Sequence, residues 1–396
     1  MNAEFSHCIV GKTALGLLLL SAGPLKAACQ DSQSAGVSTT QLRGPPSCRT
    51  CAVRQTKVAT ITDDAFAIET VPIAAARNSK GSYLVGGKDG KLGIFDKSGK
   101  LLRTFGRRGG GPGEFQSIWR IHVSYRDTIL VYDMFARRIT VIDPNLTRAV
   151  RTFTFDDHRG AIPLHNGSFI TSGSVATLRN SGLSLHLVSA NGTVLKSASA
   201  DSAVFRRQPG RMLGRSLFLI NESSFIAAPM HRYRIELWSV DLKLKRIFER
   251  SVDWFLPLSD EAMIDIPSRK SLPMQLSSVA GSGSDGIVIA HLFSGSSKFK
   301  PDPALATRKG EVSVRESGSG PSLNKYVDTT IEFIELGTSS VLASGRFPGA
   351  YALVNQAPGG AHPPLYCIVR ETPDGGETLE IVGFDFVGRT SENHFH

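Results

Sequence analysis

The feature that most constrains the fold is an internal repeat of short apolar segments separated by turns. One copy ends at Phe105 and the next ends at Phe153. The matching segments are Ser82–Val85 with Thr128–Val131, Leu92–Asp96 with Ile139–Asp143, and Leu102–Phe105 with Val150–Phe153. The offset between them grows only from 46 to 48 residues, so single-residue gaps align the copies. A unit of four short strands that recurs every roughly 40–50 residues is typical of a β-propeller blade.

The second copy has the pattern of a four-stranded antiparallel meander. Gly109–Gly113 combines glycines with a proline, which predicts a turn or loop before the first strand. Thr128–Tyr132 is β-branched and apolar, as in a buried strand, and Asp133 can bond the backbone of the turn that follows. Arg138–Ile142 and Val150–Phe155 predict the last two strands.

The segments GRRGGGPGEF and TILVYDMFARRITVIDPN resemble the NHL-type repeat of six-bladed β-propellers. The resemblance is good over Ile73–Phe153, although Tyr132 stands where that pattern has a small residue before the aspartate. The whole chain resembles the NHL-like and TolB-like propellers that bacteria secrete, most of which have no assigned activity. The resemblance implies an all-β fold of six four-stranded antiparallel blades.

The first residues have the pattern of an export signal. Thr13–Ala22 is an apolar run of ten residues, too short for a membrane helix, so residues 1–28 are predicted to be a signal peptide. Leu25–Cys29 resembles a bacterial lipobox, which implies lipidation of Cys29, although Lys26 departs from the pattern. Ordinary secretion by cleavage nearby is the alternative. Either way, we expect an exported protein in the periplasm or at the cell surface.

The mature chain is predicted to begin with a flexible tether, residues 29–56, because this segment is largely polar. The propeller is predicted to occupy residues 57–390. Lys57–Ile61 is a short strand candidate, and we expect it to complete the last blade and so remove a sheet edge. Residues 294–324 form a polar insertion in the fifth blade, either a binding loop or a disordered segment.

The tether contains the pair Cys48 and Cys51. A c-type haem motif would need histidine where Ala52 stands, and a zinc site would need a second pair of ligands. In an oxidising compartment, a small structural disulfide between them is the favoured interpretation. Cys367 lies in an apolar strand and is expected to be a buried free thiol.

The formal net charge of the chain is +10, but its basic residues are scattered. We therefore expect a soluble basic surface and no nucleic-acid partner. Attraction to an anionic lipid or polysaccharide is the second interpretation.

Metal chemistry has little support in the sequence. In a propeller, the innermost strand of each blade lines the central channel. The strands predicted for this position carry no carboxylates, which argues against a calcium-dependent hydrolase. His122, His165 and His291 lie near inner strands, but three dispersed histidines are weak support for zinc. We expect no metal or cofactor, and a metal-dependent hydrolase or lyase, lactonase-like or amidating-lyase-like with its site in the central channel, is the alternative function.

The best candidate site is the mouth of the channel, where basic and aromatic side chains are close in sequence. Its predicted residues are Arg107, Arg108, Trp119, Arg120 and His122. Arginine with tryptophan suits an anionic ligand, a sugar-like ligand or a protein contact. The alternative is that Trp119 packs between blades and the arginines are solvated. The sequence thus predicts a monomeric, non-catalytic binding module for an envelope protein or an anionic glycan.

Overall fold

The computed structural model describes residues 36–44, 46–48, 50–62, 66–68, 73–155, 157–174, 183–199, 214–230, 232–255, 275–281, 286–295, 327–358 and 363–387. All of them belong to the unit formed by residues 32–396. The predicted signal peptide, Cys29 and nearly all of the insertion at 294–324 lie outside these ranges, although Ser294 belongs to a described strand.

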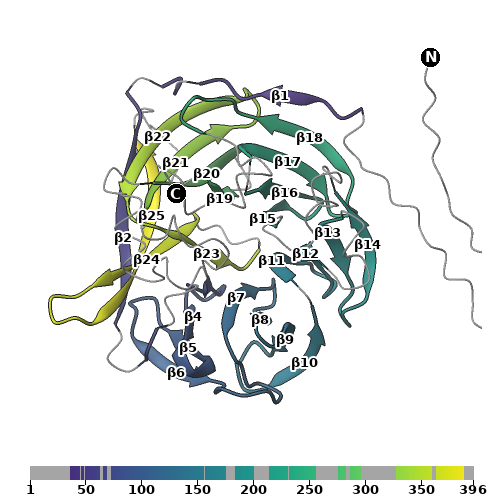
Figure 1. Cartoon of the computed structure of the whole chain (residues 1–396), viewed down its shortest axis with the longest axis vertical. Helices are drawn as coiled ribbons and strands as arrows, with labels where there is room; N and C mark the ends of the chain where they lie inside the picture. The colour runs from purple at the N-terminus through teal and green to yellow at the C-terminus, as the bar shows by residue number, and fades with distance from the viewer. Residues whose placement is uncertain are drawn as a thin grey trace, which may run out of the picture. The chain divides into compact units, whose positions relative to one another are not determined.

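The described residues form antiparallel meanders of four strands, drawn in Figure 1. The separate meanders are β7 (Ile118–Val123), β8 (Ile129–Asp133), β9 (Arg138–Ile142) and β10 (Ala149–Thr154); β11 (Asp157–Pro163), β12 (Phe169–Ser174), β13 (Leu185–Val188) and β14 (Val194–Ala198); β15 (Arg215–Asn221), β16 (Ser224–Pro229), β17 (Arg234–Ser239) and β18 (Leu244–Glu249); and β19 (Gln275–Gly281), β20 (Ile287–Gly295), β21 (Val327–Glu335) and β22 (Ser340–Pro348).

An eight-stranded sheet holds the remaining strands, in the order β2-β25-β24-β23-β3-β4-β5-β6. Its members are β2 (Ala52–Thr62), β3 (Ala75–Arg77), β4 (Tyr83–Gly87), β5 (Lys91–Phe95), β6 (Leu101–Phe105), β23 (Ala352–Gln356), β24 (Leu365–Glu371) and β25 (Glu377–Val387). Among the described strands, the pairing that joins the two halves is the parallel one between β23 and β3, of Asn355 with Ala76 and Gln356 with Arg77. Each half is therefore a four-stranded unit of its own.

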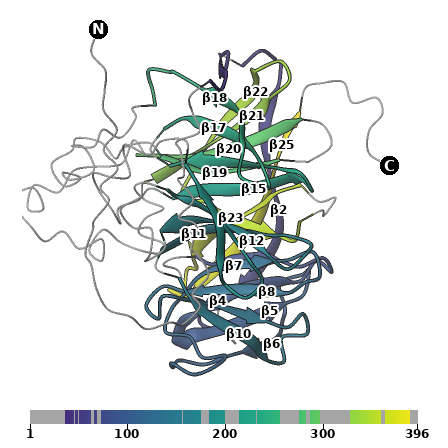
Figure 2. The ribbon, with the colours of Figure 1, turned by 90° about the vertical axis from the view of Figure 1, so that its right-hand side faces the viewer.

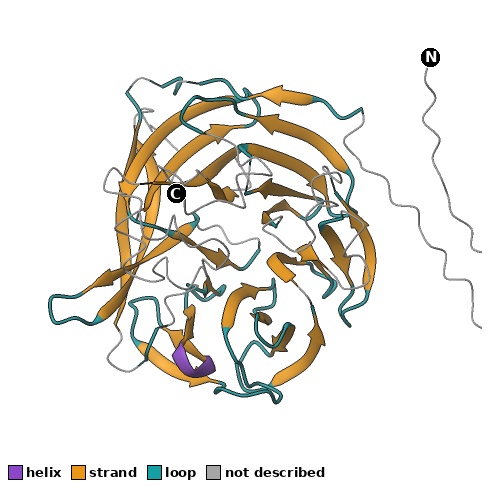
Figure 3. Ribbon diagram, in the orientation of Figure 1, coloured by secondary structure: helices purple, strands orange, loops and turns teal. Residues whose placement is uncertain are grey.

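The meanders follow one another around a common centre, and the first strands of the meanders lie nearest to it (Figure 1). The view from the side shows the successive meanders from β4–β6 at one end to β17–β22 at the other (Figure 2). Strands and turns account for nearly all of the described chain, and the single helical element is a 3-10 turn at Lys88–Gly90 (Figure 3). This arrangement confirms the predicted all-β propeller fold.

The apolar cores lie between neighbouring meanders. One cluster joins Leu130 and Tyr132 of β8 to Phe155, Phe169 and Val188, all nearly inaccessible to solvent. Burying one such side chain contributes about 1.5–3 kcal/mol, so packing between meanders, rather than within one, holds the ring together. Within the described part of the chain, no helix is long and apolar enough to cross a membrane.

The glycine-rich loop before β7 is held by two charged residues of the same meander. Asp133, fully buried at the end of β8, accepts hydrogen bonds from the backbone N–H groups of Gln116, Ser117 and Ala136 at 2.7–3.2 Å. Arg138 donates to the carbonyl oxygens of Gly110, Gly111 and Glu114 at 2.5–3.2 Å. The aspartate of the repeat thus fixes the loop backbone, as its position at the end of a strand predicts.

The N-terminal strand completes the last meander. β2 pairs antiparallel with β25 from Ala52–Val387 to Thr62–Thr378, so it takes the outer position that a fourth strand would fill. The expected closing strand is present, and it is longer than the predicted Lys57–Ile61.

The prediction of a flexible tether is wrong for the described residues 36–44, 46–48 and 50–56. Strand β1 (Thr39–Gln41) pairs in parallel with β18 as the fifth strand of that sheet, and Leu42 is buried in the core beside Phe248. Arg43 then bridges to Ser340 on β22, and the N–H of Ser47 donates to the carbonyl of Val341. A polar segment needs no core of its own when it bonds to existing sheet edges, so composition alone misjudged it.

A disulfide joins Cys48 and Cys51, with their Cα atoms 5.3 Å apart, immediately before β2 begins. Cys367 is a fully buried free thiol on β24, and burial raises its pKa to about 12. The thiol is therefore protonated and inert at neutral pH.

Candidate functional site

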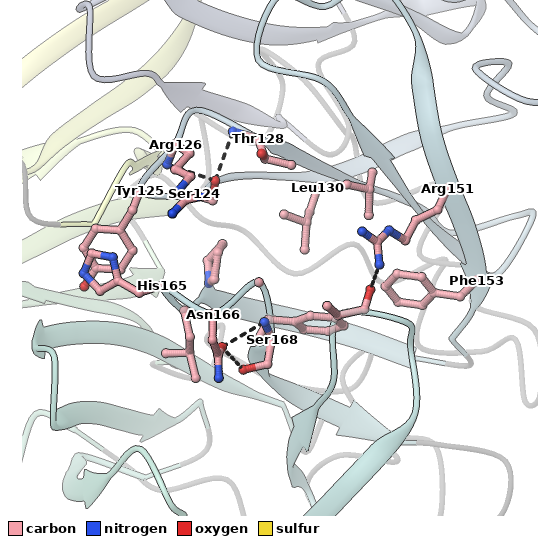
Figure 4. A pocket seen from close by; sticks show the side chains of 16 residues that line it. Ser124, Tyr125, Arg126, Thr128, Leu130, Arg151, Phe153, His165, Asn166 and Ser168 are labelled. Atoms are coloured by element: carbon pink, nitrogen blue, oxygen red, sulfur yellow. Dashed lines mark hydrogen bonds between the residues drawn. The ribbon is translucent and has the colours of Figure 1, made fainter.

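A pocket of about 390 Å³ lies between the β7–β10 and β11–β14 meanders (Figure 4). The turn from β7 to β8, residues 124–128, forms one side, and the turn from β11 to β12, residues 164–168, forms the other. Leu130, Val141 and Phe169 supply apolar lining between them. A cavity of this size is within the range of small-ligand sites.

The inner end of the pocket is walled by a stacked pair of rings. The Tyr125 ring lies on the His165 imidazole, with the centroids 3.5 Å apart and an interplanar angle of 20°. His165 Nε2 lies 3.2 Å from Glu222 Oε1, a contact between two exposed side chains that adds little stability. Burial, and next the charge of Glu222, raise the pKa of Tyr125, so its phenol stays protonated at neutral pH.

These contacts belong to a series of side-chain contacts that links turns of four successive meanders. The backbone N–H and hydroxyl of Ser79, in the β3–β4 turn, donate to the Asp127 carboxylate at 2.9 and 2.6 Å. Asp127 and Tyr125 share the β7–β8 turn, His165 is in the β11–β12 turn, and Glu222 is in the β15–β16 turn. Four equivalent turns are thus linked along one rim of the ring. The pocket lies at the contact between Tyr125 and His165.

The outer end of the pocket is closed by a second stacked pair and an arginine. Phe153 on β10 stacks on Phe169, with the ring centroids 5.5 Å apart. The guanidinium of Arg151 donates to the carbonyl oxygen of Ala190 in the β13–β14 turn (Figure 4). Arg151 therefore links the β7–β10 meander to the β11–β14 meander, and it also lines the pocket.

The turns that line the pocket are rigid because their side chains bond their own backbone. The Ser124 hydroxyl accepts from the N–H groups of Arg126 and Thr128, at 3.3 and 3.0 Å. The Asn166 side-chain oxygen accepts from the Ser168 N–H at 3.0 Å and from the Ser168 hydroxyl. Such Asx- and Ser-type turns are preformed, so a ligand would not need to order them.

The lining has an uneven charge. It contains the guanidinium groups of Arg126 and Arg151, and no aspartate or glutamate is among the described residues that line the pocket. Glu222 lies at its border through His165. A neutral or anionic group is therefore the better fit electrostatically.

The structure does not bring the five predicted site residues together, and none of them lines this pocket. Arg107 forms an ion pair with Glu114 at 2.7 Å, and Arg108 forms a backbone bridge to Phe115. Trp119 packs against the cluster between the β7–β10 and β11–β14 meanders, and the Arg120 guanidinium lies over its ring, 5.9 Å from the centroid. Trp119 therefore packs between two blades, as in the alternative interpretation of the sequence, and not in a site with the other four residues.

His122 is also withdrawn from the surface. Its side chain is 5% exposed, and burial together with the nearby charge of Arg120 lowers its pKa to about 3. Arg107 does line a second hollow of about 500 Å³, together with Arg148 and Glu114, at the rim between β6 and β10. That hollow contains only one of the five predicted residues.

The histidines of the zinc hypothesis are scattered. His165 contacts Glu222, while His291 is buried on β20 with its Nδ1 2.9 Å from the Ser278 hydroxyl. Within the described ranges, no three histidine, cysteine, aspartate or glutamate side chains gather as metal ligands would. Nothing in this part of the chain brings His122, His165 and His291 into one site.

Tyr125, Arg126 and Arg151 were not predicted as site residues from the sequence, and His165 was predicted only as a possible metal ligand. The available signal was the repeat itself, because Tyr125 and His165 both follow an inner strand, in turns that occupy equivalent places. Arg151 likewise matches Arg103 in the preceding copy, which donates to the carbonyl of Asn145 in the next meander.

Comparison with known proteins supports the fold. Residues 62–166 match a family, DUF5128, described as a 6-bladed beta-propeller. A solved protein of the duf4221 family from Bacteroides vulgatus has 11% identity and a TM-score of 0.56 over 85% of this chain and 99% of its own. A Bacteroides fragilis protein described as exported has 10% identity and a TM-score of 0.52 over 88% and 99%. No curated protein matches the sequence.

Proposed function

We propose that the protein is an exported, non-catalytic, monomeric six-bladed β-propeller that binds an acidic glycan in the pocket between its second and third blades. The observation that carries this proposal is a pocket of about 390 Å³ with two arginines, no described carboxylate and two stacked ring pairs in its walls. Guanidinium groups suit sugar carboxylates or phosphates, and ring faces suit the apolar faces of sugar rings.

Six is the number of blades when each half of the eight-stranded sheet is counted separately. The short parallel contact between β23 and β3 supports this count, because the other pairings within each half are antiparallel. The description of the matched family as a 6-bladed beta-propeller supports it as well. An NHL-like or TolB-like relationship is part of the same proposal.

Export is supported by the apolar run at Thr13–Ala22 and by the similar Bacteroides fragilis protein that is described as exported. We further propose that Cys29 is lipidated. Expression in a Gram-negative host with a labelled fatty acid tests this, and Cys29→Ser should abolish the label. A wild-type chain without label would mean ordinary secretion.

Calorimetric titration with tetragalacturonate, an acidic oligosaccharide, tests the binding function. We expect saturable binding that weakens at least tenfold in Tyr125→Ala and in Arg126→Gln, because both side chains line the pocket. Arg107→Gln is the matched control, since Arg107 is paired with Glu114 outside the pocket and its loss should not affect binding. Neutral cellotetraose should bind more weakly than the acidic sugar.

The alternative is a metal-dependent hydrolase or lyase. Among the residues that the structure describes, no group of side chains is placed to bind a metal ion, so this alternative has no structural support there. Chelator-sensitive turnover of lactones or amidating-lyase substrates, together with one metal ion per chain by elemental analysis, would replace the binding proposal by this one.

A further inference from the structure

Every outer strand of the propeller carries one extra residue relative to its neighbour. The strand pairings place a β-bulge at Val58 in β2, Leu102 in β6, Val150 in β10, Leu195 in β14, Lys245 in β18 and Leu342 in β22. Five of these six residues are aliphatic. A bulge normally turns a sheet edge away from other chains, and charged side chains along an edge add to that protection.

The N-terminal segment shows what an extended chain does at these edges. Along β18, β1 adds a parallel strand, and the Arg246 side chain donates to the Thr40 hydroxyl at 3.0 Å. Along β22, the same segment bonds to Ser339 and Val341, and the bulge residue Leu342 is only 5% exposed. Cys51 and Val53 pack against the cluster that contains Leu342. The propeller therefore already binds an extended segment at two outer edges.

Three consecutive outer strands, β6, β10 and β14, have no such cover among the described residues. Their bulge residues Leu102, Val150 and Leu195 are 57%, 47% and 60% exposed. Figure 1 shows these strands at the outside of the ring, and β1 lies along β18 instead. Aliphatic side chains this exposed, at the same place in three successive blades, are poor protection for an edge and good anchors for a partner.

A basic residue follows the bulge in each of these strands. Arg103, Arg151 and Lys196 donate to the carbonyl oxygens of Asn145, Ala190 and Asp241, in the turn before the outer strand of the next blade. On β18 the equivalent Arg246 is the residue that reaches the added strand. β2 differs from these strands. Its bulge residue Val58 is 46% exposed, but the residue that follows is buried Ala59 and not a basic residue.

We propose that β6, β10 and β14 form a docking surface for an extended segment of a partner protein that carries alternating aliphatic and acidic side chains. The partner adds a strand to the open edge, as β1 does on β18, which is the general mode of β-strand addition. Its aliphatic side chains cover Leu102, Val150 or Leu195. Its carboxylates meet Arg103, Arg151 or Lys196 in the role that Thr40 has toward Arg246. The surface shares Arg151 with the proposed glycan pocket, but none of its three bulge residues lines that pocket, so variants of these residues test the surface independently.

Fluorescence anisotropy of a labelled decapeptide of alternating glutamate and valine, titrated with the mature full-length protein, tests the proposal. We expect saturable binding that weakens at least tenfold in the variant carrying Leu102→Lys, Val150→Lys and Leu195→Lys. Lysine is tolerated at a bulge, because Lys245 occupies that position on β18. Thermal melting confirms that the variant folds.

Val58→Lys is the matched control, since Val58 is an exposed bulge residue that no basic residue follows, and binding should be unchanged. A lysine–valine decapeptide should bind at least tenfold more weakly than the glutamate–valine peptide. Absence of binding at millimolar protein, equal binding of the two peptides, or an equal loss in Val58→Lys would each overturn the proposal.

Discussion

The phenol ring of Tyr125 lies flat on the imidazole of His165, with the ring centroids 3.5 Å apart. The two residues come from equivalent turns in adjacent blades, so their contact is both a joint between blades and a wall of the pocket. The packing of the blades therefore determines the shape of the pocket, and the proposed ligand site uses the same side chains that join the blades.

The first prediction concerns this joint. Stacked aromatic pairs contribute about 0.5–1.5 kcal/mol beyond the area that they bury. Tyr125→Ala and His165→Ala should therefore each lower the free energy of unfolding modestly, and the double variant should lose less than the sum. A double-mutant cycle by urea denaturation measures the coupling, and strictly additive losses would mean that the stack contributes nothing.

A second prediction concerns the aspartate of the repeat. Asp133→Ala leaves three backbone N–H groups of buried or half-buried turns without their acceptor, so we expect a loss of about 2–4 kcal/mol in the free energy of unfolding. Asp143→Ala is the matched control, because Asp143 bonds the turn after β9 where water can replace it. Equal losses in the two variants, measured by urea denaturation, would refute a special role for Asp133.

Three buried histidines predict a pH-dependent stability. Burial is the main cause that lowers the pKa of His122 and His291 to about 3 and that of His186 to about 4, from the ordinary value of 6.5. Below pH 6.5 the unfolded chain binds protons at these residues while the folded chain does not. Stability is therefore complete above pH 6.5 and is lost as the pH falls toward 4, by about 1.4 kcal/mol per pH unit for each histidine.

Urea denaturation between pH 5 and pH 7 measures this slope in a range where most carboxylates stay ionised. If the His291→Gln variant folds, the free energy of unfolding should change less steeply with pH. The change per pH unit should fall by about 1.4 kcal/mol, which corresponds to one proton. A free energy of unfolding that does not change over this range would mean that the histidines are not buried as neutral groups.

The N-terminal segment provides another test. A Cβ atom added at Gly44 would lie 2.6 Å from a guanidinium nitrogen of Arg250, which is held in the core by Glu332. Gly44→Ala should therefore destabilise the protein by about 1–3 kcal/mol. Gly110→Ala is the control, because no atom lies within 4 Å of the added methyl there. Equal melting temperatures for the two variants would mean that the segment does not pass closely over Arg250.

Much of the fold could be predicted because it rests on local patterns. The repeat, the turns and the closing strand depend on the spacing of apolar residues and glycines, which are visible in one sequence. Strand β19 was not predicted, because Gln275–Gly281 is rich in serine and glycine and becomes a strand only by pairing with β20. The pairing of β1 with β18 likewise depends on an edge that is remote in sequence.

The site could not be predicted because it depends on contacts between blades. A β-bulge at Trp119 interrupts the alternation of β7, and Ile121, His122 and Val123 are all buried, so His122 is not available for the site predicted at the channel mouth. Tyr125 and His165 meet only because two turns from adjacent blades are packed together. No spacing along the chain contains that information.

A crystal structure of the protein with tetragalacturonate bound would show directly whether the pocket between the two blades holds an acidic glycan. We expect sugar density between the turns 124–128 and 164–168, with a ring against Tyr125 and His165 and a carboxylate at Arg126 or Arg151. Sugar bound instead in the hollow beside Arg107 and Arg148, or at Trp119 and Arg120, would contradict it. So would a structure at saturating sugar with the pocket unchanged and no sugar bound anywhere.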